Sequence, residues 1–269
     1  MMARLLHVSD LHVGAHDEGR HEIEAAVREL VERERPEVVV ASGDLSPRNR
    51  ADQHELAAAF LRSLGAPIVA LSGNHDLPRF PPGRLTSPRA RFEAVWGSSE
   101  AEYRSDGLVV CGLNSVRPWK YQRGALGDDD LTRVSECFRN VPQGALRIVA
   151  LHHHLTSPPL RFGKRPIPRR ASVLAALADA GAELVLSGHT HQSLVVESRE
   201  FLFRTEAPGG LVLAVAPGLG RPRPTRHAEA RGFHLFEAGA ETLRAVTYAW
   251  TSAGLAEIAE RTFRRQLAR

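Results

Sequence analysis

Residues 37–76 read EVVVASGDLSPRNRADQHELAAAFLRSLGAPIVALSGNHD, and this stretch decides the fold class. The runs at 37–42 and 68–72 are short, apolar and rich in β-branched residues, which is typical of buried strands. Between them, residues 52–64 place apolar side chains on one face at helical spacing. A strand, a helix and a second strand with short connections predict an alternating α/β architecture. Each strand runs directly into a polar cluster, GD after the first and GNHD after the second.

The same alternation extends in both directions from this stretch. We expect further strands at residues 4–9, 102–104, 108–113, 147–151 and 183–187, and further helices at residues 21–35, 128–139 and 170–180. From residue 193 the hydrophobic period changes to two, so residues 193–250 predict an antiparallel C-terminal part. A basic tail is expected at 251–269, and the proline-rich residues 77–87 predict a loop. We interpret residues 1–269 as a single domain whose catalytic motifs lie between residues 10 and 191.

The composition excludes several classes of protein. The chain has 269 residues, 43% of them hydrophobic, which is enough to fill a large core. Cys111 and Cys137 form no CxxC motif, which excludes a disulfide scaffold and a zinc ribbon. The net charge of +4 is mild and does not by itself indicate a nucleic-acid partner. No apolar run is long enough to span a membrane and charged residues come too early for a signal peptide, so we expect a cytoplasmic protein.

Five polar clusters follow predicted strands. They are Asp10-Leu11-His12, Gly43-Asp44, Gly73-Asn74-His75-Asp76, His152-His153-His154 and Gly188-His189-Thr190-His191. In an open α/β sheet the carboxyl ends of the strands meet at one edge, where ligands bind, so we expect the clusters to form one site. Carboxylates, imidazoles and an amide oxygen, without a thiolate, are ligands of hard to borderline dications. The sequence therefore predicts two divalent or mixed-valence metal ions, with manganese, iron and zinc as candidates.

The order DxH, GD, GNHD, strand-end histidine and GHxH resembles the pattern of calcineurin-like metallophosphoesterases. The similarity extends over roughly residues 4–240, and within the family residues 43–76 are most similar to the class III cyclic-nucleotide phosphodiesterases. VVCGLNS at 109–115 and VALHHHL at 149–155 also resemble that branch. The resemblance implies a four-layered α-β-β-α sandwich, in which two mixed β-sheets pack face to face and helices cover the outside.

The resemblance also implies a role for each motif residue. The expected metal ligands are Asp10, His12 and His191 for one ion, Asn74, His153 and His189 for the other, and Asp44 as the bridge between them. His75 is expected to be the catalytic residue that contacts the leaving-group or phosphoryl oxygen without binding metal. The family usually has His-His-Pro in the fourth motif, with the first histidine as the ligand. Leu155 stands in the proline position here, so His153 aligns best, while His152 and His154 remain alternatives.

These features predict a dinuclear metal-dependent phosphodiesterase that hydrolyses a P–O bond with a metal-bound hydroxide. The expected partner is a small phosphoester, and the resemblance to the class III branch makes a 3′,5′-cyclic nucleotide the leading candidate. The alternatives are a hydrolase of glycerophosphodiesters or other phosphodiesters, a phosphomonoesterase, a repair nuclease of the Mre11 type, and a metal-bearing interaction scaffold without activity. We expect neither clear nucleic-acid binding nor membrane insertion, and the sequence leaves the oligomeric state open.

Overall fold

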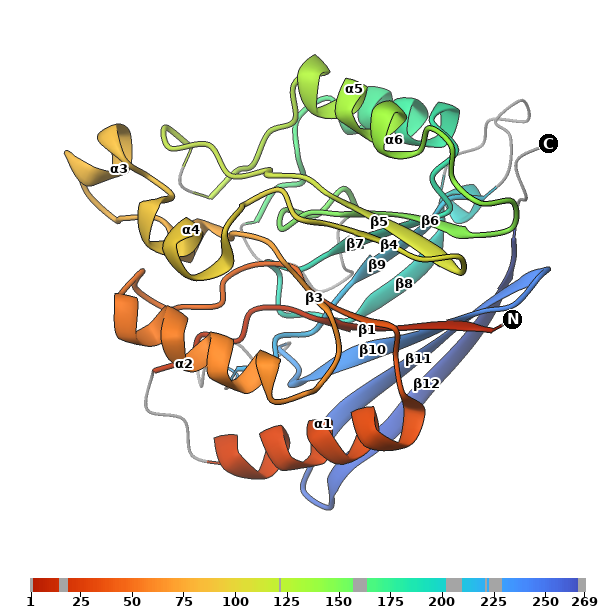
Figure 1. The fold of residues 1–269 in the computed structure, drawn as a ribbon, viewed down its shortest axis with the longest axis horizontal. Coiled ribbons are helices and arrows are strands. Elements are labelled where there is room, and N and C mark those ends of the chain that lie inside the picture. The colour runs from red at the N-terminus through yellow and green to blue at the C-terminus, as the bar shows by residue number, and fades with distance from the viewer. Residues whose placement is uncertain are drawn as a thin grey trace.

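Two six-stranded β-sheets lie face to face with helices on both outer faces in the computed structural model of the chain (Figure 1). The structure describes residues 2–14, 19–120, 122–156, 164–201, 210–220, 222 and 229–265. Each sheet contains both parallel and antiparallel strands. The predicted α-β-β-α sandwich of two mixed sheets is therefore confirmed.

The first sheet has the strand order β12-β11-β10-β1-β2-β3. Its strands are β1 (Ala3–Val8), β2 (Val38–Ala41), β3 (Ile68–Ala70), β10 (Gly232–Ala238), β11 (Thr242–Thr251) and β12 (Gly254–Arg264). β1, β2 and β3 are parallel, whereas β10, β11 and β12 continue the sheet from β1 as antiparallel strands. The three parallel strands therefore end at the same edge, just before three of the polar motifs.

The second sheet has the strand order β4-β5-β6-β7-β9-β8. Its strands are β4 (Glu102–Arg104), β5 (Leu108–Gly112), β6 (Leu146–Ala150), β7 (Leu184–Ser187), β8 (Leu194–Glu197) and β9 (Val212–Val215). The four inner strands are parallel, and the two edge strands are antiparallel to their neighbours. β6 and β7 end just before the HHH and GHxH motifs.

Helices cover the outer face of each sheet (Figure 1). On the first sheet these are α1 (Arg20–Glu34), α2 (Ala51–Arg62) and α4 (Ala90–Trp96), and on the second sheet α5 (Asp128–Cys137) and α6 (Arg170–Asp179). The short α3 (Gly83–Thr86) lies in the segment after β3. Among the helices of the described residues, none has the length and apolar character needed to cross a membrane.

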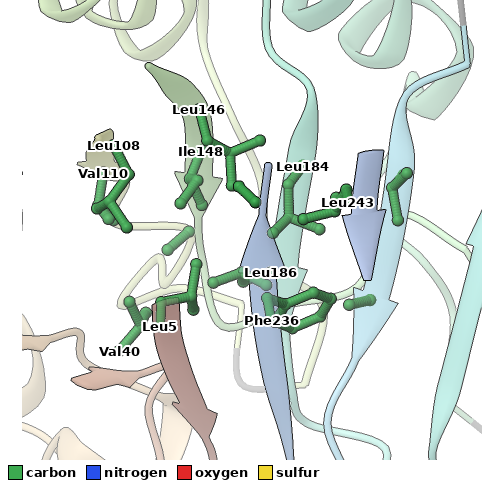
Figure 2. Packing of buried hydrophobic residues seen from close by; sticks show 14 of the residues in the cluster. Leu5, Val40, Leu108, Val110, Leu146, Ile148, Leu184, Leu186, Phe236 and Leu243 are labelled. Carbon is green, nitrogen blue, oxygen red and sulfur yellow. The ribbon is translucent and has the colours of Figure 1, made fainter. Parts of the chain in front are cut away.

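An apolar core lies between the two sheets (Figure 2). Because side chains alternate along a strand, Leu5 of β1 enters this core while its neighbour Leu6 packs under the helices of the first sheet. Ile148 of β6 faces Leu5 from the other sheet's side of the same core. Replacing either Leu5 or Ile148 with alanine should cost about 2–5 kcal/mol of stability. By packing the two sheets against each other, this core keeps the strand ends of one sheet next to those of the other.

Three predictions about the periphery are wrong. Much of the predicted basic tail, residues 254–264, is the edge strand β12, whose main chain pairs with β11 although most of its side chains are exposed. The last four residues of that tail lie outside the described residues. The C-terminal part is not wholly antiparallel, because β9 runs parallel to β7. The predicted loop at 77–87 contains the single helical turn α3.

Candidate metal centre

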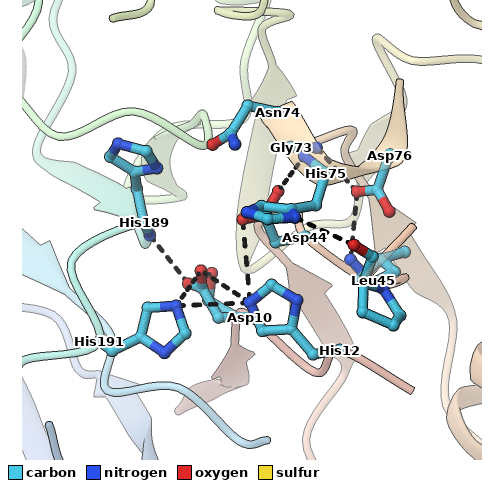
Figure 3. Close-up of polar contacts among 12 residues, drawn as sticks. Asp10, His12, Asp44, Leu45, Gly73, Asn74, His75, Asp76, His189 and His191 are labelled. Atoms are coloured by element: carbon cyan, nitrogen blue, oxygen red, sulfur yellow. Dashed lines mark hydrogen bonds and ion pairs between the residues drawn. The ribbon is translucent and has the colours of Figure 1, made fainter. Parts of the chain in front are cut away.

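The predicted motifs meet where the parallel strands of the two sheets end. β1, β2 and β3 lead to Asp10, Asp44 and Asn74, while β6 and β7 lead to His152 and His189. All five side chains are buried. Figure 3 shows residues from both sheets pointing toward one another at this edge. Residues separated by as many as 179 positions in the chain are therefore in direct contact.

The backbone at this edge adopts an unusual conformation. Asp10, His12, Asp44, His189 and His191 all have a positive φ, between 46° and 72°. The left-handed conformation costs a residue other than glycine on the order of 1–3 kcal/mol, and such strain gathers at functional sites. Five of the predicted metal ligands share it, so the fold maintains strain where the sequence predicts chemistry.

The first cluster of donor atoms consists of Asp10, His12 and His191. Nε2 of His191 lies 3.1 Å from Oδ1 of Asp10 and 3.4 Å from Nε2 of His12. Oδ2 of Asp10 is held from behind by the Ser9 hydroxyl at 2.7 Å and by the backbone N–H of His189 at 2.8 Å. These two hydrogen bonds leave Oδ1 of Asp10 directed at the two imidazoles. One carboxylate oxygen and two ring nitrogens therefore converge.

The second cluster consists of Asn74, His152 and His189. Nε2 of His152 lies 3.3 Å from Oδ1 of Asn74 and 3.2 Å from Nδ1 of His189. Nδ1 of His152 lies 2.9 Å from the carbonyl oxygen of Ser42. Because a carbonyl oxygen only accepts hydrogen bonds, this contact places a proton on Nδ1, so a neutral His152 ring has its lone pair on Nε2. The lone pair of His152 therefore faces the other two members of the cluster.

Asp44 lies between the two clusters. Its Oδ1 accepts a hydrogen bond of 2.8 Å from the backbone N–H of His75. Its Oδ2 lies 3.5 Å from Nε2 of His152 and 3.9 Å from Nε2 of His12. One oxygen of a single carboxylate thus faces a histidine of each cluster.

The two remaining histidines of the run surround the second cluster. Nδ1 of His153 lies 2.9 Å from Oγ of Ser115, and the backbone N–H of His153 donates to the same oxygen at 3.1 Å. The rings of His153 and His154 pack on His189, with centroid separations of 4.7 Å and 6.0 Å. His153 also belongs, with His152 and His189, to a group whose donor atoms are close enough to hold a cation.

Asp76 joins two of the motif turns. Its carboxylate accepts hydrogen bonds from the backbone N–H groups of Leu45, Ser46 and Gly73, with lengths of 3.1, 2.8 and 2.8 Å. The Ser46 hydroxyl donates a fourth, of 3.0 Å. Burial raises the pKa of Asp76, and the facing His54 opposes this shift. Asp76 therefore fixes the GD turn to the GNHD turn.

His75 stands at the exposed side of the centre. Its Nδ1 lies 3.0 Å from the carbonyl oxygen of Pro47, so Nδ1 carries a proton. The ring meets His12 edge to face, with centroids 5.1 Å apart. His75 is partly exposed, whereas the predicted ligands Asn74 and Asp44 beside it are buried. The ring can therefore contact a molecule that approaches from solvent.

Burial and proximity set the protonation of the donors. Burial lowers the pKa of His12 to about 4, although the nearby Asp44 carboxylate opposes this shift. Burial also lowers the pKa of His189 well below its usual value. Burial alone would raise the pKa of Asp10, but the surrounding imidazoles, His191 foremost, together outweigh burial and the pKa is lowered. At neutral pH Asp10 is thus a carboxylate, and His12 and His189 are neutral imidazoles, the forms that bind metal ions.

Glycine is required beside two of the carboxylates. A Cβ atom on Gly188 would lie 1.8 Å from Oγ of Ser9 and 2.6 Å from Oδ2 of Asp10. A Cβ atom on Gly73 would lie 2.2 Å from both the backbone nitrogen and Oδ1 of Asp44. The glycines of the GNHD and GHxH motifs therefore allow the chain to approach the carboxylates closely.

The donor atoms fit two dications. Around a tetrahedral ion with bonds of about 2.1 Å, neighbouring donor atoms lie about 3.4 Å apart. The closest donor separations in the two clusters are 3.1 to 3.5 Å. Among the described residues of the centre, Oδ1 of Asp10 and the Nε2 atoms of His153 and His189 are buried without a hydrogen-bond partner. In His189 it is the other ring nitrogen, Nδ1, that faces His152. Such buried polar atoms call for a ligand, and oxygen and imidazole donors suit manganese, iron and zinc.

A model of the calcineurin-like phosphoesterase family matches residues 3–193, which is well over half of the chain and includes all five motifs. The chain belongs to this family. The resemblance seen in the motifs is thus confirmed, and family membership supports a hydrolytic phosphoesterase.

Individual relatives agree with this family. A probable cyclic nucleotide phosphodiesterase from Synechococcus sp. is 28% identical over 179 residues. The alignment covers 64% of each protein, so the chain spans less than two thirds of the length of that relative.

Solved structures of low sequence identity share the fold. Purple acid phosphatase PPD1 from yellow lupin superimposes with a TM-score of 0.71 at 15% identity, covering 97% of this chain and 53% of that one. A dimetal phosphatase from Danio rerio gives 0.67 at 13% identity, covering 97% and 98%.

The structure adds residues that the motif analysis did not single out. Ser9, Ser42 and Ser115 each place a hydroxyl or carbonyl oxygen against a motif side chain. Ser9 and Ser42 stand directly before the DxH and GD motifs. A small polar residue just before a motif is therefore the sequence signal that could have identified these two positions. Nζ of Lys164 also reaches the centre and donates to the carbonyl oxygen of His189.

Proposed function

We propose that the chain is a dinuclear metal-dependent phosphoesterase that hydrolyses phosphodiesters. The observation that carries this proposal is Oδ2 of Asp44, which faces a histidine from each donor cluster. Bound side by side, two dications would lower the pKa of a water molecule toward neutrality and neutralise charge on the phosphoryl oxygens. Buried carboxylates, neutral imidazoles and one amide oxygen are suited to hold them.

The proposed ligands are those of the two clusters, joined by Asp44. They are Asp10, His12, His191 and Asp44 for one ion, and Asn74, His152, His189 and Asp44 for the other. His152 takes the place of His153, the residue expected from the sequence. The lone pair of His152 lies close to Asn74 and Asp44, whereas the ring of His153 packs against His189 and Ser115.

His75 is the proposed catalytic residue. The contact of its Nδ1 with the Pro47 carbonyl fixes the ring orientation, and its backbone N–H is held by Asp44. We assign Nε2 to the substrate. Donation of a hydrogen bond from Nε2 to a phosphoryl oxygen, or of a proton to the departing alkoxide, uses the doubly protonated ring, in which Nδ1 keeps its bond to Pro47. The partial exposure of His75 supports this role, because the substrate must reach the ring from solvent.

We propose that the substrate is a nucleotide phosphodiester of the cyclic nucleotide class. Support comes from the Synechococcus relative, which is described as a probable cyclic nucleotide phosphodiesterase, and from the motif resemblance. The ordered set of motifs, all present in this chain, favours an enzyme over an inactive scaffold.

Hydrolysis of bis-p-nitrophenyl phosphate and of p-nitrophenyl phosphate by the manganese-loaded protein tests the proposal. We expect a large preference for the diester. A preference for the monoester would contradict the phosphodiesterase proposal and favour a phosphatase. Two bound metal ions without turnover of either ester would instead favour the scaffold.

A further inference from the structure

A cavity of about 570 Å³ opens beside the proposed catalytic histidine. Its lining residues are Pro47, Arg48, His75, Leu77 and Arg79. Cavities that hold a small molecule usually have volumes of about 300–1,000 Å³, so there is room here for more than one phosphoryl group. The cavity lies on the His75 side of the centre, where the leaving group departs in the proposed mechanism.

The two arginines of this cavity occupy equivalent places after two catalytic motifs. Arg48 follows the GD motif in the sequence GDLSPR, and Arg79 follows the GNHD motif in GNHDLPR. A proline precedes each arginine and restricts the main chain there. The Pro47 carbonyl also contacts His75, and the backbone N–H of Arg48 donates to Oε1 of Gln53 at 3.2 Å. Arg48 therefore extends from main chain that also contacts His75, whereas Arg79 is placed by its position just after the GNHD motif.

Neither guanidinium is neutralised within the described part of the chain. Arg48 and Arg79 are exposed, and neither side chain forms an ion pair or hydrogen bond with a described residue. The guanidinium of Arg79 lies over the ring of Phe80, 5.2 Å from its centroid. By contrast, the nearby exposed Arg50 pairs with Asp52 at 3.0 Å. Two unneutralised guanidinium groups beside a phosphoester site provide favourable positions for a further anion.

We propose that Arg48 and Arg79 bind a second phosphate group of the substrate, carried by its leaving group. This inference rests on the proposed function, because it takes His75 to mark the leaving-group side. The substrate is then a nucleotide phosphodiester with two phosphates, a chemistry that a cyclic dinucleotide has and a cyclic mononucleotide lacks. The planar forks of the two arginines suit a phosphate, which accepts paired hydrogen bonds from each.

Competitive inhibition of bis-p-nitrophenyl phosphate hydrolysis tests this inference on the metal-loaded protein. The competitors are thymidine 3′,5′-bisphosphate, thymidine 3′-monophosphate and thymidine 5′-monophosphate, which differ only in the number and position of phosphates. For the wild type we expect an inhibition constant for the bisphosphate about tenfold or more below that of the tighter monophosphate. In the double variant Arg48→Ala/Arg79→Ala this ratio should fall to about twofold or less.

The matched control is the double variant Arg50→Ala/Arg89→Ala. It removes the same number of positive charges nearby, but Arg50 and Arg89 pair with Asp52 and Glu93 and do not line the cavity. This control should keep the wild-type ratio and the wild-type rate. Equal inhibition by bisphosphate and monophosphate in the wild type would overturn the inference. A tenfold ratio that survives in Arg48→Ala/Arg79→Ala would overturn it as well.

Failure of the proposed function is recognised separately. If the metal-loaded protein does not hydrolyse the diester, the proposed function fails, and equilibrium dialysis with the same three thymidine nucleotides then measures binding directly. Preferential binding of the bisphosphate that is lost in Arg48→Ala/Arg79→Ala would still support an anion site at the cavity. Equal binding of all three nucleotides would overturn it.

Discussion

The two donor clusters of the metal centre contrast in how their members are specified. The first cluster, Asp10, His12 and His191, uses the residues that the DxH and GHxH motifs indicate. In the proposed assignment the second cluster draws one ligand from a run of three adjacent histidines, which all follow the same strand and are all buried. Motif spacing alone therefore determines the first cluster, whereas side-chain direction decides the second.

The difference has a simple physical origin. In an Asp-x-His or His-x-His motif the residue between the ligands has a side chain that does not bind metal, so there is one way to assign the two donors. Three consecutive histidines offer three equivalent donors, and only their hydrogen-bond partners distinguish them. The Ser42 carbonyl orients His152, and the Ser115 hydroxyl orients His153.

The largest effect should come from the residue shared by both clusters. Asp44→Asn removes the negative charge of the carboxylate that faces His12 and His152. We expect kcat for the diester to fall by about a thousandfold, which corresponds to about 4 kcal/mol in the barrier. Metal analysis should show weaker retention at both positions. Full activity with two ions retained would show that the clusters do not depend on Asp44.

The next largest effect distinguishes His152 from His153 as the metal ligand. His152→Ala should lower kcat by about a hundredfold and reduce the bound metal toward one ion per chain, because the second cluster loses a donor. His153→Ala removes a ring that packs behind His189 and should cost about tenfold or less, comparable to loss of an outer support. Rates and metal content are measured on the two variants in parallel. The reverse order of effects would assign the ligand to His153 instead.

A smaller loss of activity is expected from changing Asp76, whose carboxylate joins the GD and GNHD turns. Asp76→Asn leaves one oxygen acceptor where the carboxylate accepts four hydrogen bonds, so the GD and GNHD turns should loosen. We expect kcat to fall by about 10–100-fold with both ions retained. The free energy of unfolding should fall by about 1–3 kcal/mol. Loss of metal without loss of stability would mean that Asp76 acts on the ions and not on the turns.

The smallest effect is a pH-dependent change in stability caused by His234, which lies outside both clusters. His234 is buried in β10, with Nε2 3.0 Å from Oγ of Ser193, and burial lowers its pKa to about 3. The unfolded chain therefore binds more protons than the native chain below the usual histidine pKa of about 6.5. The contribution of neutral His234 to stability is complete above about pH 6.5 and is lost as the pH falls toward 3.

Denaturant titrations with chelator at pH 7 and pH 5 measure this contribution. Wild type should lose about 2 kcal/mol more stability between the two pH values than His234→Asn. Equal losses would show that His234 is not held neutral.

The sequence predicted the interior of the fold better than its periphery. The sequence predicts β1, β2 and β3 well, because a buried parallel strand needs a run of apolar residues. The polar residues that follow each run mark the turn at which the strand ends. The sequence indicates a tail where the edge strand β12 lies, because the side chains of β12 are mostly exposed and its main-chain pairing with β11 leaves no hydrophobic pattern. The cavity beside His75 is not predictable from the sequence either, because its shape depends on how the loops pack.

The most direct test of the account is the metal content of the purified protein, measured by elemental analysis alongside its diesterase activity. We predict two ions per chain, with the activity lost on chelation and recovered as the second ion is restored. One ion per chain at full activity, or hydrolysis that survives removal of both ions, would contradict a dinuclear centre built around Asp44.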